Sequence, residues 1–227
     1  MTYAIVPAGG HGARMGSRRP KQYLRLGQAP ILVATLKALA RARSIVGIVV
    51  AVPEAHVAAT RRVLARARVA KILDVVAGGV DRQESVWRGL QRLPADARVV
   101  IVHDAVRPFI TADLVERVRA AGAGGAATCG TPVRETVKRV TDGAVEATIP
   151  RQGLWLTQTP QAFARDLLWE AHDKARRDGF AGTDDAVLVE RLGMPVAMVA
   201  GLAQNLKITT PEDLRTARSW VRPRRRA

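Results

Sequence analysis

Short, uninterrupted runs of valine and isoleucine alternate with segments of helical character along most of the chain. Two of these runs are 45–52 (IVGIVVAV) and 98–103 (RVVIVH), and a third, 3–7, lies near the start of the chain. Runs that are apolar at every position, rather than at every second one, indicate strands buried on both faces. Such strands separated by helices predict an α/β fold: a single doubly wound, mainly parallel sheet with helices on both faces.

The remaining elements follow from the same patterns and from capping residues. Thr111 is a good N-cap residue. Asp113 and Glu116 follow it in the first turns, where acidic side chains favour a helix. We expect helices over 31–43, 54–68, 81–93, from Thr111 onward, 162–177, 184–192 and 211–221. We expect further strands at 72–76 and 196–199, and a short extended piece at 206–208.

One segment departs from this alternation. Residues 131–150 have no helical period, and Asp142-Gly143 stands between two runs that are rich in β-branched residues, which is a strong hairpin signal. An isolated hairpin is only marginally stable in water, so we expect this one to contact a second subunit. The sequence therefore predicts one domain over 1–221, with 131–150 as a β-arm, followed by a basic tail or linker at 222–227.

Composition excludes several classes of protein. The single cysteine, Cys129, rules out an internal disulfide and a thiolate metal cluster. No apolar run approaches the roughly 20 residues that cross a bilayer, and the chain begins directly with a strand rather than a leader. We therefore expect a cytoplasmic protein that does not span a membrane.

The formal charge of +16 raises the alternative of a basic nucleic-acid-binding module. Aromatic residues, however, make up only 4% of the chain, which leaves few platforms for base stacking. The arginines are also spread over several predicted helices rather than gathered in one motif. An anionic small-molecule substrate would benefit equally from this positive field.

The loop after the first strand carries the clearest chemical signal. It holds four glycines and four cations, namely Gly9, Gly10, Gly12, Gly16, Arg14, Arg18, Arg19 and Lys21. Glycines let backbone amides approach a ligand, and fixed cations beside them suit a polyphosphate. The spacing fits neither a Walker loop nor a dinucleotide fingerprint. A flexible, arginine-rich surface loop is the alternative interpretation.

Other polar residues follow the predicted strands at the edge where open α/β sheets bind ligands. They are Gly78, Gly79, Asp81, Arg82 and Ser85 after one strand, 103–108 after another, and Asn205 and Lys207 near the C-terminus. Asp104 is the best candidate for a Mg²⁺ ligand, because this ion takes few carboxylates and completes its shell with phosphate oxygens and water. Alternatively, Asp104 caps the local turn or pairs with Arg107.

No nucleophile or general base is evident among these residues. The four histidines form no constellation, and no Ser-His-Asp or paired-carboxylate arrangement can be recognised. An inventory of cations, glycines and one metal carboxylate suits phosphoryl or nucleotidyl transfer, in which catalysis is mainly positioning and charge stabilisation.

With these residues in hand, the chain resembles the 2-C-methyl-D-erythritol 4-phosphate cytidylyltransferase family of non-mevalonate isoprenoid biosynthesis. The matching stretches occur in family order: AIVPAGGHGARMG with PKQYL, VVAGGVDRQESV, VHDAVRP, PVRETVKRV, IPRQGLWLTQTPQAF, TDDA and NLKITTPEDL. The resemblance implies transfer of CMP from CTP to methylerythritol phosphate, with release of pyrophosphate and with Mg²⁺ or another divalent cation. Cytidylyl transfer to another polyol phosphate, such as ribitol phosphate, is the closest alternative.

The resemblance also implies roles for individual residues. Arg14 and Lys21 match the family's transition-state stabilisers, and Asp104 matches its metal ligand. The nucleotide would contact Ala8, Gly9, Gly10, Gly79 and Ser85, and the polyol phosphate would be positioned by Arg151, Lys207, Thr136, Arg107, Thr159 and Thr183.

Further implications concern partners. Family members form homodimers that exchange a β-arm, so that Arg151 and Thr136 reach the partner's site. Some members are fused to the cyclodiphosphate synthase of the same pathway, so the chain is either a stand-alone enzyme or one domain of such a protein. Two positions depart from the family pattern, since Val80 and Gln204 stand where acidic residues are frequent.

Overall fold

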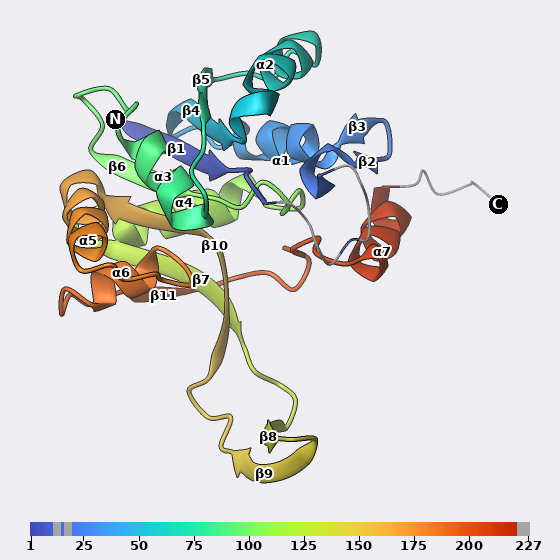
Figure 1. Ribbon diagram of the computed structural model, residues 1–227, viewed down its shortest axis with the longest axis vertical. Helices are drawn as coiled ribbons and strands as arrows, with labels where there is room; N and C mark the ends of the chain where they lie inside the picture. The colour runs from blue at the N-terminus through green and yellow to red at the C-terminus, as the bar shows by residue number, and fades with distance from the viewer. Residues whose placement is uncertain (11–14, 16–19, 222–227) are drawn as a thin grey trace.

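The fold is built on a seven-stranded sheet in the order β11-β7-β10-β6-β1-β4-β5 (Figure 1). The computed structural model describes residues 1–10, 15 and 20–221. Among the described strands of this sheet, only β10 runs antiparallel to its neighbours, which confirms the expected mainly parallel α/β fold. The strands are β1 (Thr2–Pro7), β4 (Ile45–Val52), β5 (Ile72–Ala77), β6 (Val99–Val102), β7 (Ala126–Pro132), β10 (Trp155–Ala164) and β11 (Ala197–Ala200).

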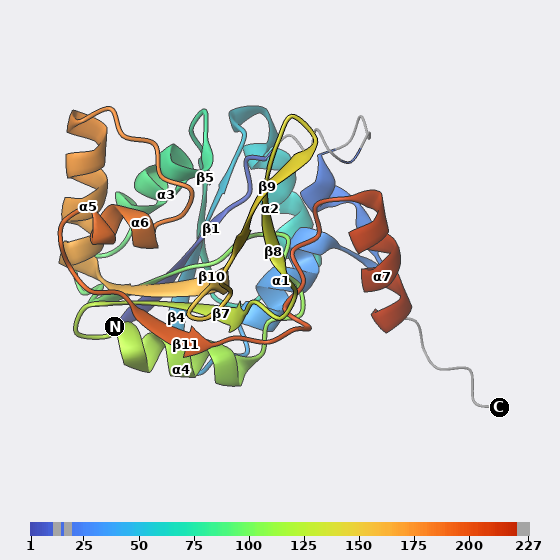
Figure 2. The ribbon, with the colours of Figure 1, turned by 90° about the horizontal axis from the view of Figure 1, so that it is seen from below.

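Helices cover both faces of the sheet, because successive side chains of each strand point to opposite sides. Ala4 and Val6 of β1 pack in the core beneath α1 (Ile31–Leu39), α2 (Val57–Arg66) and α4 (Ala112–Gly122). Tyr3 and Ile5 pack in the core beneath α3 (Arg82–Leu90), α5 (Arg165–Arg177) and α6 (Ala186–Glu190). Figure 2 shows the sheet with α4 on one side and α5 and α6 on the other. None of the described helices is long and apolar enough to span a membrane.

A small third cluster holds the C-terminal part of the chain against the sheet. Leu214 of α7 (Pro211–Val221) packs with Leu26 and Ile31, near the short strands β2 (Arg25–Leu26) and β3 (Ala29–Pro30). The structure also has two 3-10 turns among its described residues, η2 (Lys21–Tyr23) and η3 (Glu54–His56). The amide of Ile208 donates to the carbonyl of Val106 at 2.9 Å, so the segment before α7 is fastened beside the loop that follows β6.

The predicted hairpin is present and projects away from the sheet (Figure 1). It consists of β8 (Val137–Thr141) and β9 (Ala144–Ile149). Asp142 and Gly143 form the turn with φ of 51° and 80°, the two positive values that a two-residue hairpin turn requires. Its apolar side chains are largely exposed, including Val140, Val145 and, at its base, Leu156. The pairing of this arm with a second subunit stays a prediction.

The sequence-based prediction was wrong in one region. Residues 126–130 and 155–161 were expected in neither a helix nor a strand, but they belong to β7 and β10. Residues 131–132 were expected in the arm and also belong to β7. The helix expected from Ala162 begins at Arg165, since Ala162 and Phe163 lie in β10, fully buried and paired with Ile101 and Val100. Packing against the sheet overrides the helix propensity of these residues. The short strands β2 and β3 were not expected either. The remaining differences lie mainly at the ends of elements; for example, the helix expected over 31–43 ends at Leu39.

Candidate active site

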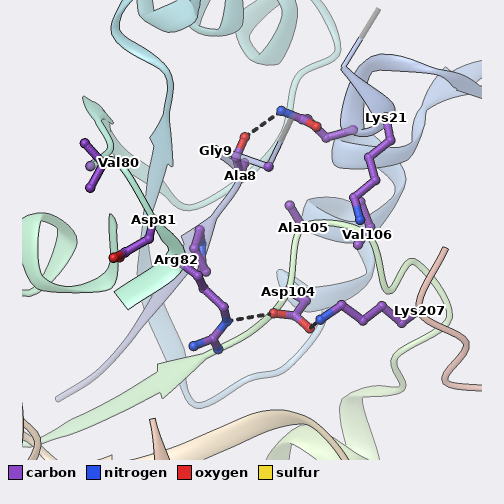
Figure 3. A pocket seen from close by; sticks show the side chains of 14 residues that line it. Ala8, Gly9, Lys21, Val80, Asp81, Arg82, Asp104, Ala105, Val106 and Lys207 are labelled. Carbon is purple, nitrogen blue, oxygen red and sulfur yellow. Dashed lines mark hydrogen bonds and ion pairs between the residues drawn. The ribbon is translucent and has the colours of Figure 1, made fainter. Parts of the chain in front are cut away.

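A pocket opens at the edge of the sheet where β1, β5 and β6 end. It is lined by Pro7, Ala8, Gly9, Gly10, Lys21, Gln22, Gly79, Val80, Asp81, Arg82, Asp104, Ala105, Val106 and Lys207. These residues come from five separate segments of the chain, and we call this space the first pocket. Figure 3 shows the Lys21 side chain on the side of the pocket opposite to Arg82. The loops expected from the sequence to converge at this edge therefore do so.

The opening strand leads directly into one wall of the first pocket. The amide of Ala8 donates to the carbonyl of Ala51 at 2.7 Å, and the carbonyl of Ala8 accepts from Nε2 of the buried Gln22 at 2.6 Å. Gln22 thereby ties the first glycines of the loop to the turn that carries Lys21. The structure confirms that Ala8, Gly9, Gly10 and Lys21 line one pocket, whereas Arg14 lies outside the described residues.

The turn after β5 forms the opposite wall. The amide of Gly79 donates to Oγ of Ser85 at 3.1 Å, and this hydroxyl donates to the carbonyl of Asp81 at 2.7 Å. Asp81 also caps α3 by accepting from the amide of Glu84. Ser85 is buried behind the turn and is not among the residues that line the pocket. Its contribution in this structure is to fix the backbone of Gly79.

Asp104 lies at the bottom of the pocket among three cations. Its Oδ1 accepts from Nε of Arg82 at 3.2 Å, and its Oδ2 lies 2.8 Å from Nζ of Lys207 and 3.5 Å from Nε of Arg107. Burial alone would raise the pKa of Asp104, but the charges of Arg82, Lys207 and Arg107 outweigh it and hold the pKa well below its usual range. The carboxylate is therefore ionised, and its pairing with Arg107 is one of three such contacts.

A second pocket adjoins the first. It is lined by Arg82, Asp104, Arg107, Thr157, Gln158, Thr159, Gln161, Thr183, Asp184 and Lys207. Four of the residues predicted to position the polyol phosphate are in this lining, namely Arg107, Thr159, Thr183 and Lys207. The two pockets share Arg82, Asp104 and Lys207, so the ion pairs among these three side chains form the boundary between them (Figure 3).

Two predicted site residues lie away from both pockets of their own chain. Arg151 follows β9 and Thr136 precedes β8, at the base of the arm, and both are exposed. The Arg151 guanidinium donates to the carbonyl of Arg134. Neither residue therefore lines a pocket of its own chain, and the expectation that they act in the site of a second subunit stays a prediction.

His103 and Cys129 are structural rather than reactive groups. His103 is fully buried, and its Nε2 donates to the carbonyl of Arg107 at 3.2 Å while its Nδ1 accepts from the Thr159 hydroxyl at 3.0 Å. Burial lowers the pKa of His103 to about 4, so the ring is neutral near pH 7. Burial raises the pKa of the Cys129 thiol to about 12, which keeps it from acting as a thiolate nucleophile.

The donor set suits a divalent cation that arrives with phosphate groups. Within residues 1–10, 15 and 20–221, no group of three or more His, Cys, Asp or Glu side chains is placed to hold a metal by itself. The ionised Asp104 carboxylate at the bottom of a cation-lined pocket provides one oxygen ligand, and Mg²⁺ commonly takes one or two carboxylates together with substrate phosphates. Asp104 thus fits the role that the sequence assigned to it.

The sequence analysis placed Arg82 at this edge of the sheet but gave it no role. In the structure, Arg82 lines both pockets and also donates from Nη1 to Oδ2 of the buried Asp185 at 2.7 Å. The TDDA stretch contained the signal, because two carboxylates follow Thr183 directly. Gln22 was missed as well, and a glutamine next to Lys21 carries no signal that it reaches back to the glycine loop.

The first pocket has a glycine loop and cations, and the second has an arginine, a lysine and hydroxyl groups. Together they define a nucleotidyltransferase of the α/β type. The family model for 2-C-methyl-D-erythritol 4-phosphate cytidylyltransferase (IspD) matches residues 2–223. The chain therefore belongs to the 2-C-methyl-D-erythritol 4-phosphate cytidylyltransferase family.

Individual relatives agree over nearly the whole length. The chain is 45% identical over 222 residues to the 2-C-methyl-D-erythritol 4-phosphate cytidylyltransferase of Syntrophus aciditrophicus, covering 96% of this chain and 95% of the relative. The crystal structure of the Thermus thermophilus protein of that name is similar with a TM-score of 0.78 and 35% identity, over 96% of this chain and 98% of the other. The bifunctional IspDF from Campylobacter jejuni has a TM-score of 0.79 and 25% identity, and the match covers 94% of this chain but 53% of that one.

Proposed function

We propose that this chain transfers the CMP group of CTP to the phosphate of 2-C-methyl-D-erythritol 4-phosphate, giving CDP-methylerythritol and pyrophosphate. The observation that carries the proposal is the pair of adjoining pockets, which share only the boundary formed by Arg82, Asp104 and Lys207. A transfer between two anionic substrates needs such a geometry, because the attacking phosphate and the nucleotide must meet at one point with their charges compensated.

The nucleotide fits the first pocket. The backbone of Ala8, Gly9 and Gly10 lies opposite the turn at Gly79, and exposed amides beside cations suit a triphosphate. We assign Lys21, together with Arg14 from the same loop, to stabilising the charge on the phosphate oxygens as pyrophosphate leaves. Ser85 supports this pocket indirectly through its hydrogen bond with Gly79.

The polyol phosphate fits the second pocket. Lys207 and Arg107 supply positive charge there, and the hydroxyls of Thr159 and Thr183 supply hydrogen-bonding groups. Arg107 is itself held by the carbonyl of Asn205, to which its Nη1 donates at 2.7 Å. The attacking phosphate oxygen is already anionic near pH 7, so the reaction needs no general base, in agreement with the buried, neutral His103.

We further assign Asp104 as the ligand of a divalent cation, with Mg²⁺ as the expected ion. When bound, the cation would neutralise part of the triphosphate charge and hold its oxygens in place. Arg82 and Lys207, which contact the same carboxylate, keep Asp104 ionised for this purpose.

The assembly and setting of the enzyme are also part of the proposal. Arg151 and Thr136 lie at the base of the arm and line neither pocket of their own chain, so we propose a homodimer in which they complete the partner's second pocket. The protein is expected to act in the cytoplasm. The likeness to the bifunctional IspDF of Campylobacter jejuni supports the proposal that a cyclodiphosphate synthase acts with this chain, either fused or as a separate protein.

Pyrophosphate release in the presence of CTP and Mg²⁺ tests the proposed reaction. Turnover is expected with 2-C-methyl-D-erythritol 4-phosphate and not with ribitol phosphate at the same concentration. Turnover with ribitol phosphate alone would identify a different polyol-phosphate cytidylyltransferase. No turnover with either, together with tight, salt-sensitive binding of DNA, would instead select the nucleic-acid-binding alternative.

A further inference from the structure

Arg82 connects the candidate active site to a buried, hydrogen-bonded histidine–aspartate pair behind it. Arg82 is the first residue of α3, and its guanidinium bridges two carboxylates. Its Nε donates to Oδ1 of Asp104 at 3.2 Å, and its Nη1 donates to Oδ2 of Asp185 at 2.7 Å. Asp104 belongs to the pocket boundary, whereas Asp185 belongs to the packed layer of helices on the α3 side of the sheet.

Asp185 is held from the opposite direction by a histidine. Both side chains are almost completely buried, and Nε2 of His172 donates to Oδ1 of Asp185 at 3.0 Å. The His172 ring, on α5, stacks against Trp87 of α3 with an interplanar angle of 20°. The backbone amide of Asp185 donates to Oε1 of Gln161 at 3.2 Å. Each carboxylate oxygen of Asp185 therefore has one defined partner, and the group has little freedom to turn.

The result is a continuous row of polar contacts, His172–Asp185–Arg82–Asp104–Lys207, which runs from α5 to the segment before α7. Burial alone would raise the pKa of Asp185, but Arg82 and His172 lower it, so Asp185 is ionised. A buried carboxylate with polar partners is a poor source of stability compared with apolar packing, although it can fix one geometry. What this pair fixes is the direction of the Arg82 guanidinium at the boundary of the two pockets.

We propose that Arg82 is a positioning residue for the transfer step and that the buried His172–Asp185 pair holds it in place. The proposal rests on the proposed cytidylyl transfer. Arg82 orients the Asp104 carboxylate and keeps a fixed positive charge where the two substrates meet. An arginine suits this position because its planar fork reaches both carboxylates at once, whereas the ammonium of a lysine is a point charge on a flexible stem.

The first test substitutes Asp185→Asn, which keeps the shape of the side chain and removes its charge. We expect kcat to fall about 10- to 100-fold, because a small displacement of groups at a reacting centre lowers the rate by this much. The KM for CTP should stay close to that of the unchanged protein. The matched control is Asp178→Asn. Asp178 pairs with Lys174 of α5 and with Arg191, which follows α6, and it lies in the lining of neither pocket. This control should leave kcat unchanged.

A double-mutant cycle separates positioning through Arg82 from general support of the fold. Arg82→Gln alone should lower kcat at least as far as Asp185→Asn, and adding Asp185→Asn to it should lower kcat no further, because the second residue acts through the first. Fully additive losses in kcat would overturn the proposal. So would an Asp185→Asn variant that melts at a lower temperature but retains the kcat of the unchanged protein.

Two further variants decide the matter if Asp185→Asn does not fold. His172→Gln keeps a donor near Asp185, and His172→Leu removes it, so only the second should lower kcat. Arg82 is partly exposed, with 26% of its side chain accessible, so Arg82→Lys should fold, and it should lower kcat about 10-fold or more because it cannot bridge both carboxylates. Full activity of Arg82→Lys would refute the inference while the turnover of the unchanged protein still supported the proposed function.

Discussion

The ammonium of Lys207 lies 2.8 Å from Oδ2 of Asp104, and the two side chains differ sharply in accessibility, at 41% and 8%. The segment before α7 and the loop after β6 are thus joined at the boundary of the two pockets. Because the Asp104 carboxylate also contacts Arg82 and Arg107, Lys207 can exchange this partner for an incoming phosphate without leaving Asp104 unpaired. Of the three cations around Asp104, Lys207 is therefore the one best placed to exchange its carboxylate partner for a substrate phosphate.

Replacement of this lysine gives the first prediction. Lys207→Ala should raise the KM for the polyol phosphate about 10-fold or more, since a hydrogen bond to a charged group contributes about 1.5–3 kcal/mol. Initial rates at varied polyol phosphate and saturating CTP measure the effect. The control is Lys174→Ala, whose ammonium pairs with Asp178 on α5 and whose side chain has a similar accessibility of 43%. Equal KM values in the two variants would contradict the assigned role of Lys207.

Lys21 and Arg14 give the second prediction, because we propose that they act on the leaving group rather than on binding. Lys21→Ala and Arg14→Ala should each lower kcat about 100-fold or more, by analogy with the loss of one oxyanion-hole donor. Circular dichroism should show an unchanged fold. Lys37→Ala, on an exposed position of α1, is the control and should retain its turnover. Unchanged turnover in Lys21→Ala would remove this residue from the mechanism.

Mixed dimers test whether Arg151 acts in the partner's site. Arg151→Ala alone should mainly raise the KM for the polyol phosphate. In a mixture of Arg151→Ala with Lys21→Ala, half of the dimers contain one of each chain, and one of their two sites then combines an intact Lys21 with an intact Arg151. With the polyol phosphate far below the raised KM, an equimolar mixture should recover about a quarter of the normal activity when subunits exchange freely in a symmetric dimer. If Arg151 serves its own chain's pocket, the mixture shows no more activity than the two variants show separately.

The turn at Gly79 provides a prediction from packing alone. A Cβ added at Gly79 would lie 2.3 Å from the Cβ, Cγ and Cδ atoms of Glu84, whereas a Cβ at Gly124 would meet nothing within 4 Å. Gly79→Ala must therefore displace the turn, which should lower the free energy of unfolding by about 1–3 kcal/mol and raise the KM for CTP. Gly124→Ala should change neither quantity. Thermal unfolding and CTP titration of the two variants provide the comparison.

Cys129 offers a probe of local opening. The burial that raises the pKa of its thiol to about 12 leaves it protonated at pH 9, where an ordinary cysteine with a pKa of about 8.5 is mostly the reactive thiolate. The folded protein should therefore react with iodoacetamide at pH 9 only through rare opening of the structure around Cys129, and denaturant should make the reaction fast. The chain has a single cysteine, so mass spectrometry reads the result directly. Rapid labelling of the native protein would show that β7 opens easily.

Much of the fold could be predicted because the parallel strands carry their signal within a few residues. Runs such as 45–52 are apolar throughout, and β4 has those bounds in the structure. The arm could be recognised from Asp142-Gly143, since few other sequences favour two consecutive positive φ values. β10 could not, because its residues 155–164 mix polar and apolar side chains. Its pairing with β6 and β7 depends on strands distant in the sequence.

The candidate site shows the same division between local and distant information. The glycine loop and Asp104 could be found because each follows a recognisable strand, and parallel strands end at one edge. Lys21 could be found because it follows the glycines in the sequence. The separation of the site into two pockets could not be predicted, since the boundary is made by side chains from α3, the loop after β6 and the segment before α7. The role of Asp185 depends on its burial against His172, which no local pattern reveals.

The reversed direction of β10 has a consequence for the arm. Since β7 runs parallel to β6 and β10 runs against both, the chain leaves β7 and re-enters β10 at the same rim as the substrates. The arm is thus rooted beside Thr159, whose hydroxyl accepts from the amide of Asp104 at 3.0 Å. A parallel β10 would require a crossover along the length of the sheet, because the chain would leave β7 at this rim and enter β10 at the opposite one. Any force that a neighbouring molecule exerts on the arm is therefore applied close to the strand end that faces the chemistry.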